Sequence, residues 1–199
     1  MPGLLQLIAG VALGWVGWSL AAAGTLAMTI SPFAPDAQPL LNNYIPVLES
    51  PLFLVGLVVF GVGTAVLVLR SLWAAPRLGL QYDGRGALDF GLSSAAVATA
   101  VALLCFAWSW AVLPTTLHGK AYYEILFWGG GHALQFTWTL MMLVAWLWLA
   151  SACGAHLVLS PRVTVLMFLL ALLGVFVTPY AYLAHDVASV EHRNLLTWA

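Results

Sequence analysis

A histidine that follows three glycines is the residue of this 199-residue sequence best suited to chemistry. His132 comes directly after residues 129–131, inside an uncharged hydrophobic run that continues to about residue 150. An ionisable side chain in a membrane helix is costly and usually marks a functional site with a partner. Glycine stabilises a helix less than alanine does, by about 0.8–1 kcal/mol per position. Three in succession therefore indicate that another helix, a metal ion or a flat cofactor must approach closely.

Two further histidines, His185 and His192, follow the last hydrophobic run of the chain. Neutral imidazole is a favoured ligand for copper, iron and zinc, so His132, His185 and His192 are the candidate metal ligands. The neighbouring Asp186 and Glu191 would then orient these ligands. The competing interpretations are a solvated interfacial segment at 185–192 and, for His132, a hydrogen bond to a backbone carbonyl or a neighbouring helix.

The composition predicts a protein built mainly of membrane spans. Hydrophobic residues make up 63% of the chain and charged residues only 7%. Long apolar runs in such a chain indicate transmembrane helices, with membrane lipids as the surroundings. The formal net charge of −1 and the lack of a basic patch exclude nucleic acid as a partner.

Five hydrophobic runs are long enough to cross a bilayer, which takes about 20 helical residues. They cover residues 4–30, 52–75, 88–113, 125–150 and 163–183. We therefore expect an all-α fold, a polytopic membrane bundle of five helices that forms a single transmembrane domain over residues 1–199. The proline-rich segment 31–51 is expected to be an irregular loop with helix starts at its edges.

The basic residues predict the orientation of the spans, because cytoplasmic loops carry more Lys and Arg. An N-terminus inside and a C-terminus outside leave four basic residues inside and two outside. Those inside are Arg70, Arg77, Arg85 and Arg162, and those outside are Lys120 and Arg193. His132 then lies roughly 13 Å from the outer end of its span at 1.5 Å per residue. His118, His185 and His192 also belong to the outer half, whereas His156 falls in an inside turn.

The run Leu126-Phe127-Trp128, followed two residues later by Gly131-His132, resembles the sixth helix of the haem-copper oxidase catalytic subunit. That helix typically reads Leu-Phe-Trp, two further residues, then Gly-His. The resemblance implies that His132 ligates the active-site copper, or the non-haem iron of nitric oxide reductases. The wider runs 122–136 and 43–53 look like a divergent branch of this family.

The resemblance carries further expectations about cofactors, partners and location. It implies a subunit I, or its N-terminal part, that transfers electrons to oxygen or nitric oxide at a haem–metal centre. Haem and copper, or non-haem iron, would be the cofactors. Other respiratory subunits or a missing C-terminal half would be partners, and a cytochrome or a quinol would donate electrons. The expected location is the bacterial inner membrane.

The sequence also departs from the family pattern. Phe136 stands where many oxidases have a tyrosine that donates a proton and an electron. The family's adjacent His-His pair is absent, and His185 and His192 are the only candidates to replace it. The late His-x-His helix, which binds the haems in the family, is absent too, so the haem ligands are not found. Five spans are expected here against about twelve in the family. We therefore predict that the chain corresponds to an N-terminal half.

Two other classes of function remain open at the level of sequence. A non-catalytic scaffold or assembly protein, or a degenerate relative of the oxidases, would retain the helix packing and lack the cofactors. A small transporter or metal-handling protein would use His132 and Glu124 to line a path. The first three spans carry few polar residues with which to line such a path.

Overall fold

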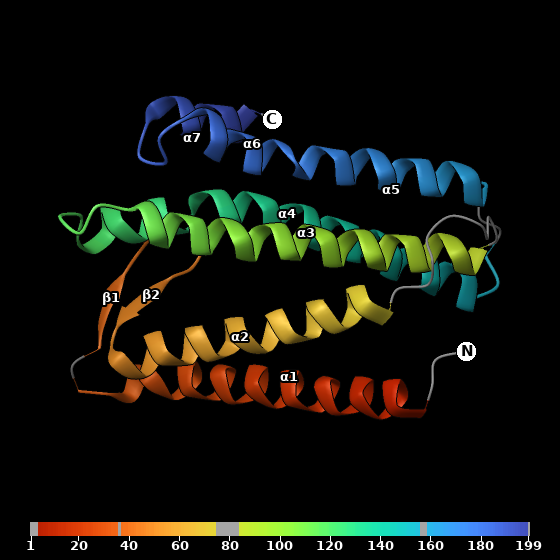
Figure 1. The fold of residues 1–199 in the computed structure, drawn as a ribbon, viewed down its shortest axis with the longest axis horizontal. Coiled ribbons are helices and arrows are strands. Elements are labelled where there is room, and N and C mark those ends of the chain that lie inside the picture. The colour runs from red at the N-terminus through yellow and green to blue at the C-terminus, as the bar shows by residue number, and fades with distance from the viewer. Residues whose placement is uncertain (1–3, 36, 75–83, 156–158, 199) are drawn as a thin grey trace. The chain divides into compact units, whose positions relative to one another are not determined.

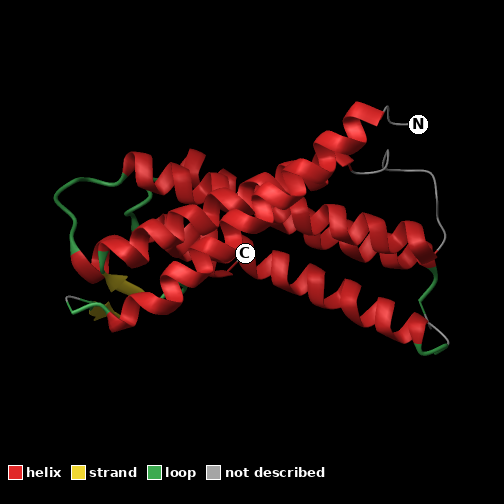
Figure 2. Ribbon diagram, turned by 90° about the horizontal axis from the view of Figure 1, so that it is seen from below, coloured by secondary structure: helices red, strands yellow, loops and turns green. Residues whose placement is uncertain are grey.

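The computed structural model describes residues 4–35, 37–74, 84–155 and 159–198 and is built almost entirely of helices (Figures 1 and 2). Within these residues the α-helices are α1 (Leu4–Ile30), α2 (Pro51–Ala74), α3 (Gly84–Val112), α4 (Gly119–Ala152), α5 (Pro161–Val175), α6 (Val177–Ala184) and α7 (Val190–Trp198). Five stretches are long and apolar enough to cross a membrane, with α5 and α6 together forming the fifth. The predicted all-α membrane fold is confirmed, and the protein is membrane-integral.

The chain forms two compact units, each of which is described by itself. The first unit comprises residues 1–74 and 113–128, and the second comprises residues 75–112 and 129–199. The helix α4 contributes its first ten residues to the first unit and the remainder, including His132, to the second. All three candidate ligands therefore belong to the second unit.

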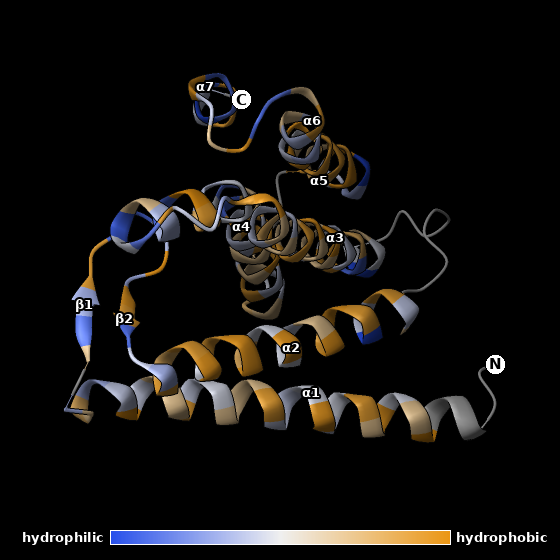
Figure 3. Cartoon of the chain, turned by 60° about the vertical axis from the view of Figure 1, so that its left-hand side comes forward, coloured by the Kyte–Doolittle hydropathy of each residue, from blue (hydrophilic) through white to orange (hydrophobic). Residues whose placement is uncertain are grey.

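The first unit is dominated by the antiparallel pair α1 and α2, which lie side by side along most of their length (Figure 3). Glycines let the two backbones meet. A Cβ atom built at Gly24 would overlap the backbone nitrogen of Phe60, and one built at Gly63 would overlap that of Ala21. Because lipid tails are as apolar as leucine, close packing of small residues is a main source of helix association in membranes.

The connection between α1 and α2 is more ordered than the sequence indicates. A short 3-10 helix, Ser31–Phe33, is followed by an antiparallel hairpin of β1 (Gln38–Leu40) and β2 (Val47–Glu49), so the expectation of an irregular loop is wrong here. Pro39 pairs with Leu48 within this hairpin. Both strands of a two-stranded sheet are edge strands. An edge strand tolerates proline, because the missing N–H can face away from the partner strand.

The second unit is built around α3, which buries a face of small residues. Gly91 makes room for Phe168 of α5 and Val144 of α4, since a Cβ there would lie 2.8 Å and 2.6 Å from them. The hydroxyl groups of Thr99 and Thr137 form a hydrogen bond of 3.2 Å between α3 and α4. These contacts hold α3, α4 and α5 together within the unit.

The fifth predicted span is interrupted, whereas residues 163–183 were expected to form one helix. The helix α5 ends at Val175, Phe176 forms a turn, and α6 begins at Val177. The cause is Pro179, which lacks an N–H for the carbonyl of Val175 and whose ring crowds that carbonyl. The short helix α7 then follows after a tight turn. The other four predicted spans agree with the helices, although α4 extends six residues further at its start.

Candidate functional site: a buried histidine beside the glycine segment

The glycine segment before His132 is covered by aromatic side chains from two other helices of the second unit. A Cβ at Gly129 would overlap the phenol of Tyr182 on α6, and one at Gly130 would overlap the ring of Phe106 on α3. The predicted close approach at these glycines is therefore confirmed. The approaching groups are side chains, and they bring α6 and α3 next to the turn of α4 that carries His132.

His192 is the most unusual polar residue of the second unit. It lies on α7, its side chain is 0% exposed, and both ring nitrogens are buried without a hydrogen-bond partner. Its ring meets that of Tyr182 edge to face, with the centroids 4.8 Å apart. A buried polar group without a partner costs about 1–3 kcal/mol. Such a group in a folded protein calls for an explanation, and a bound metal ion is one.

Local sequence signals explain how α7 holds His192. The backbone N–H of His192 donates to Oγ of Ser189 at 3.1 Å, which is the bond of a serine N-cap to the third helical residue. The acidic Glu191 lies in the first turn, where the helix dipole favours a negative charge. The carboxylate of Asp186 accepts from the N–H of Ala188 at 2.8 Å and forms the turn before the helix. Asp186 and Glu191 therefore shape the backbone of this segment.

His192 lies within electrostatic reach of each of the other two candidate ligands. The pKa of His192 is lowered from 6.5 to about 4, mainly because burial disfavours the charged ring. Repulsion from His185 and His132 lowers this pKa further, whereas Asp186 raises it. His185 is half-buried at the end of α6, where its N–H donates to the carbonyl of Ala181. His185 and His132 thus each lie close enough to His192 to affect its charge.

The histidines fit a metal only in part. Among the residues that the structure describes, no three His, Cys, Asp or Glu side chains form a group arranged to hold a metal ion. His192 offers two unpaired ring nitrogens, and His132 on α4 is the candidate for a second ligand. Structural metal sites usually have four protein ligands and catalytic zinc sites three. Two imidazoles supply part of such a set.

Tyr182 links the glycine segment, His192 and α3, and the sequence did not single it out. Its hydroxyl group shares a hydrogen bond of 2.7 Å with Ser109, and its ring lies 5.3 Å from that of Trp108. A tyrosine near the end of a span is most often an interfacial anchor, so only the fold reveals this role. Phe136, where the family has its tyrosine, packs its ring against Gly174 of α5.

The other predicted residues lie elsewhere. His118 is exposed in the turn before α4. Glu124, in the first unit, accepts a hydrogen bond of 3.0 Å from the side-chain amide of Asn43. His156 and Arg77 fall outside the described residues.

The buried state of His192 predicts a pH dependence for the metal-free protein. The pKa of His192 is lower in the folded protein than in the unfolded chain, so protons bind the unfolded chain first as the pH falls. The free energy of unfolding is therefore unaffected by this group above pH 6.5 and decreases below it. We expect stability to fall as the pH decreases from 6.5 towards 4, by about 3 kcal/mol in total. Unfolding of the wild type and of His192→Leu across this range measures the effect. Equal slopes for the two proteins would contradict it.

Comparisons with known proteins find similarity over most of the chain. It is 27% identical over 187 residues to "Uncharacterized protein RP382" of Rickettsia prowazekii (strain Madrid E), covering 89% of this chain and 35% of the relative. It is 29% identical over 163 residues to a protein of Aquifex aeolicus (strain VF5), covering 81% of this chain and 39% of the relative. No family model and no solved structure matches. The chain thus spans somewhat more than a third of the length of these relatives.

Proposed function

We propose that this chain is the histidine-bearing part of a membrane oxidoreductase of the haem-copper oxidase type. The observation that carries the proposal is His192, a fully buried imidazole with two unpaired nitrogens in the region of His132. The proposal places the chain in a bacterial inner membrane with its N-terminus inside, as the basic residues predict. Oxygen or nitric oxide would be the substrate, and a cytochrome or a quinol the electron donor.

Each residue of the region has a defined part in this proposal. His132 and His192 bind the metal, copper or non-haem iron, through neutral imidazole nitrogens. His185 stands nearby as a third candidate. A haem–metal pair, when bound, supplies the electron transfer and the binding of the diatomic substrate. The ring of Tyr182 packs against His192, whose side chain is kept from water by the fold.

In this proposal Tyr182 supplies the proton-donating phenol that Phe136 lacks. Its hydroxyl group is the phenol in contact with the region, and its bond to Ser109 at 2.7 Å fixes its direction. The phenol is the proton donor to the bound substrate, and the Ser109 hydroxyl is its hydrogen-bond partner. The missing tyrosine of the fourth span is thereby replaced by a residue of the fifth.

The remaining ligands would come from outside this chain. The relatives extend to nearly three times its matched length, which leaves room for more spans in a longer protein or a second subunit. The haem ligands of the family are not found here, so the chain alone is not proposed to bind haem. The chain's own contribution is the metal ligands, the phenol and the apolar cover.

A second function, a non-catalytic membrane scaffold, is favoured by one observation. The space above Gly129 and Gly130 is filled by the rings of Tyr182 and Phe106, which leaves no gap over these glycines for a flat cofactor. In a scaffold the glycines would serve helix packing alone. Metal analysis separates the two functions.

The experiment is a metal and haem analysis of the complex purified in mild detergent from its native membranes. We expect bound copper or iron and a reduced-minus-oxidised visible spectrum with haem bands. The variant His132→Ala is expected to lose the metal, whereas His118→Ala, which changes an exposed histidine, should retain it. A wild-type complex without metal and with a flat spectrum would overturn the proposal in favour of the scaffold.

A further inference from the structure

An arginine near the end of a membrane-spanning helix carries an inference that is independent of the proposed function. Arg70 lies one turn before the end of α2 and is partly buried against α1. Its Nε atom donates a hydrogen bond of 2.6 Å to the backbone carbonyl of Gly10. The guanidinium group fits because Gly14 has no side chain, and a Cβ there would lie 3.1 Å from Nε. The bond and the glycine fix the head group of Arg70 between the two helices.

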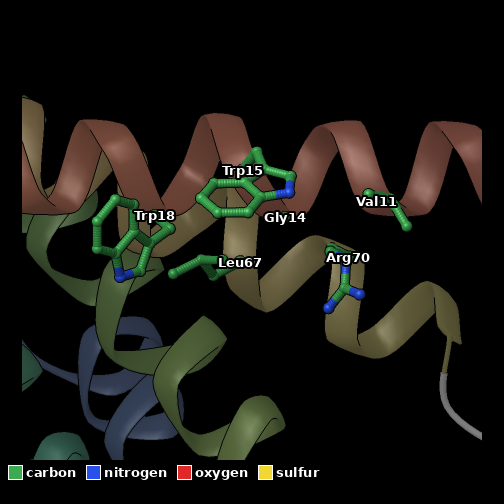
Figure 4. A pocket seen from close by; sticks show the side chains of 6 residues that line it. All are labelled: Val11, Gly14, Trp15, Trp18, Leu67 and Arg70. Atoms are coloured by element: carbon green, nitrogen blue, oxygen red, sulfur yellow. The ribbon is translucent and has the colours of Figure 1, made fainter.

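The head group of Arg70 stands at one end of an open groove along α1 and α2 (Figure 4). The groove has a volume of about 470 Å³. Its lining residues are Val11, Gly14, Trp15, Trp18, Leu67 and Arg70. Trp15 and Trp18 meet edge to face with their centroids 6.0 Å apart, and both are more than half exposed. The groove is therefore apolar along its length, with a single charge at one end.

The charge of Arg70 is not balanced within the part of the chain that the structure describes. Its hydrogen bond to Gly10 uses Nε alone, and no carboxylate of the described residues pairs with the guanidinium group. A guanidinium group has five N–H donors, so four of them, on the two Nη atoms, remain for another partner. Two parallel N–H groups match the oxygens of a phosphate. The remaining donors of Arg70, held near the end of the span, therefore suit an anion at the level of the lipid phosphates.

We propose that this groove binds an anionic phospholipid through its phosphate. The phosphate accepts hydrogen bonds from the Nη atoms of Arg70. An acyl chain lies along Leu67, Trp15 and Trp18, on the side of this guanidinium group that faces the middle of the span (Figure 4). The indoles of Trp15 and Trp18 lie further along α1, towards the middle of the span, where they offer apolar surface to an acyl chain. Basic pockets between membrane helices bind anionic head groups in this way. The lipid belongs to the leaflet in which α1 begins and α2 ends.

The test measures lipid retention by native mass spectrometry of the purified complex, titrated with phosphatidylglycerol or phosphatidylcholine. We expect at least one tightly held phosphatidylglycerol and no comparable phosphatidylcholine. Arg70→Gln should weaken this binding about five- to tenfold. Arg162→Gln removes one positive charge from the start of α5 and should leave it unchanged.

A second variant tests the groove independently of Arg70, in case Arg70→Gln disturbs the packing of α1 against α2. Val11→Trp fills the groove at an exposed position and leaves Arg70 in place, so it should also weaken lipid binding while the protein stays folded. Equal retention of the two lipids, equal loss in Arg162→Gln, or unchanged binding in Val11→Trp would each overturn the proposal. Displacement of the lipid by millimolar inorganic phosphate would overturn it too, by assigning the site to a free anion.

Discussion

Replacement of His192 with leucine should remove the bound metal and, at the same time, stabilise the metal-free protein. Leucine is close to histidine in volume and brings no polar atom into the site. The two unpaired nitrogens of the buried imidazole are then gone, which should raise the free energy of unfolding by about 1–3 kcal/mol. Metal content by mass spectrometry and unfolding after chelation measure the two effects on the same preparation.

The opposite signs of the two effects make this variant informative. A histidine kept only for packing would give the gain in stability without any loss of metal. A histidine whose nitrogens are hydrogen-bonded to ordered water would give a loss of stability instead. His118→Leu is the matched control, because it makes the same change at an exposed position and should alter neither quantity. Loss of stability together with full metal content would contradict the assignment of His192.

Replacement of Gly24 with alanine should separate α1 from α2. The added methyl group would overlap the backbone nitrogen of Phe60, and backbone cannot move aside as a side chain can. Overpacking typically costs 1–3 kcal/mol, and we expect a loss of about 3 kcal/mol here. Unfolding in mixed detergent micelles, followed by far-ultraviolet circular dichroism, measures the effect.

The matched control for this prediction lies on the partner helix. A Cβ at Gly61 of α2 meets nothing within 4 Å, so Gly61→Ala makes the same chemical change without a steric conflict. We expect it to be neutral or slightly stabilising, because alanine is the better helix former. If Gly24→Ala and Gly61→Ala lose the same stability, the two helices are not held by close backbone contact.

The length of each hydrophobic run was enough to predict the helices, since a span needs a set number of apolar residues. It was not enough to predict the interruption at Phe176. The run continues through Pro179 without a charged residue, and hydropathy does not register the missing N–H. The hairpin of β1 and β2 was missed for a related reason, because five prolines between residues 31 and 51 indicate loops more strongly than strands.

The site was predictable at the level of residue types and not of contacts. Glycines before His132 correctly indicated a close approach, but nothing in the pattern identified Tyr182 as the group that approaches. The segment that contains His192 is polar and charged, which is typical of a solvated surface. The turn at Asp186 and the serine N-cap at Ser189 are local signals for α7, but they do not show which residues cover His192. Its burial depends on the packing of α7 against other parts of the second unit, which local signals do not reveal.

The glycine contacts of α1 and α2 also determine where a reporter group can be attached. Positions 10 and 61 face open space, so a cysteine introduced at either can carry a spin label or a fluorophore without moving a backbone. Gly24 and Gly63 face the partner helix at backbone distance, and a label there would force the pair apart. A distance measured between labels at 10 and 61 would therefore report on the intact pair of helices α1 and α2 in a native bilayer.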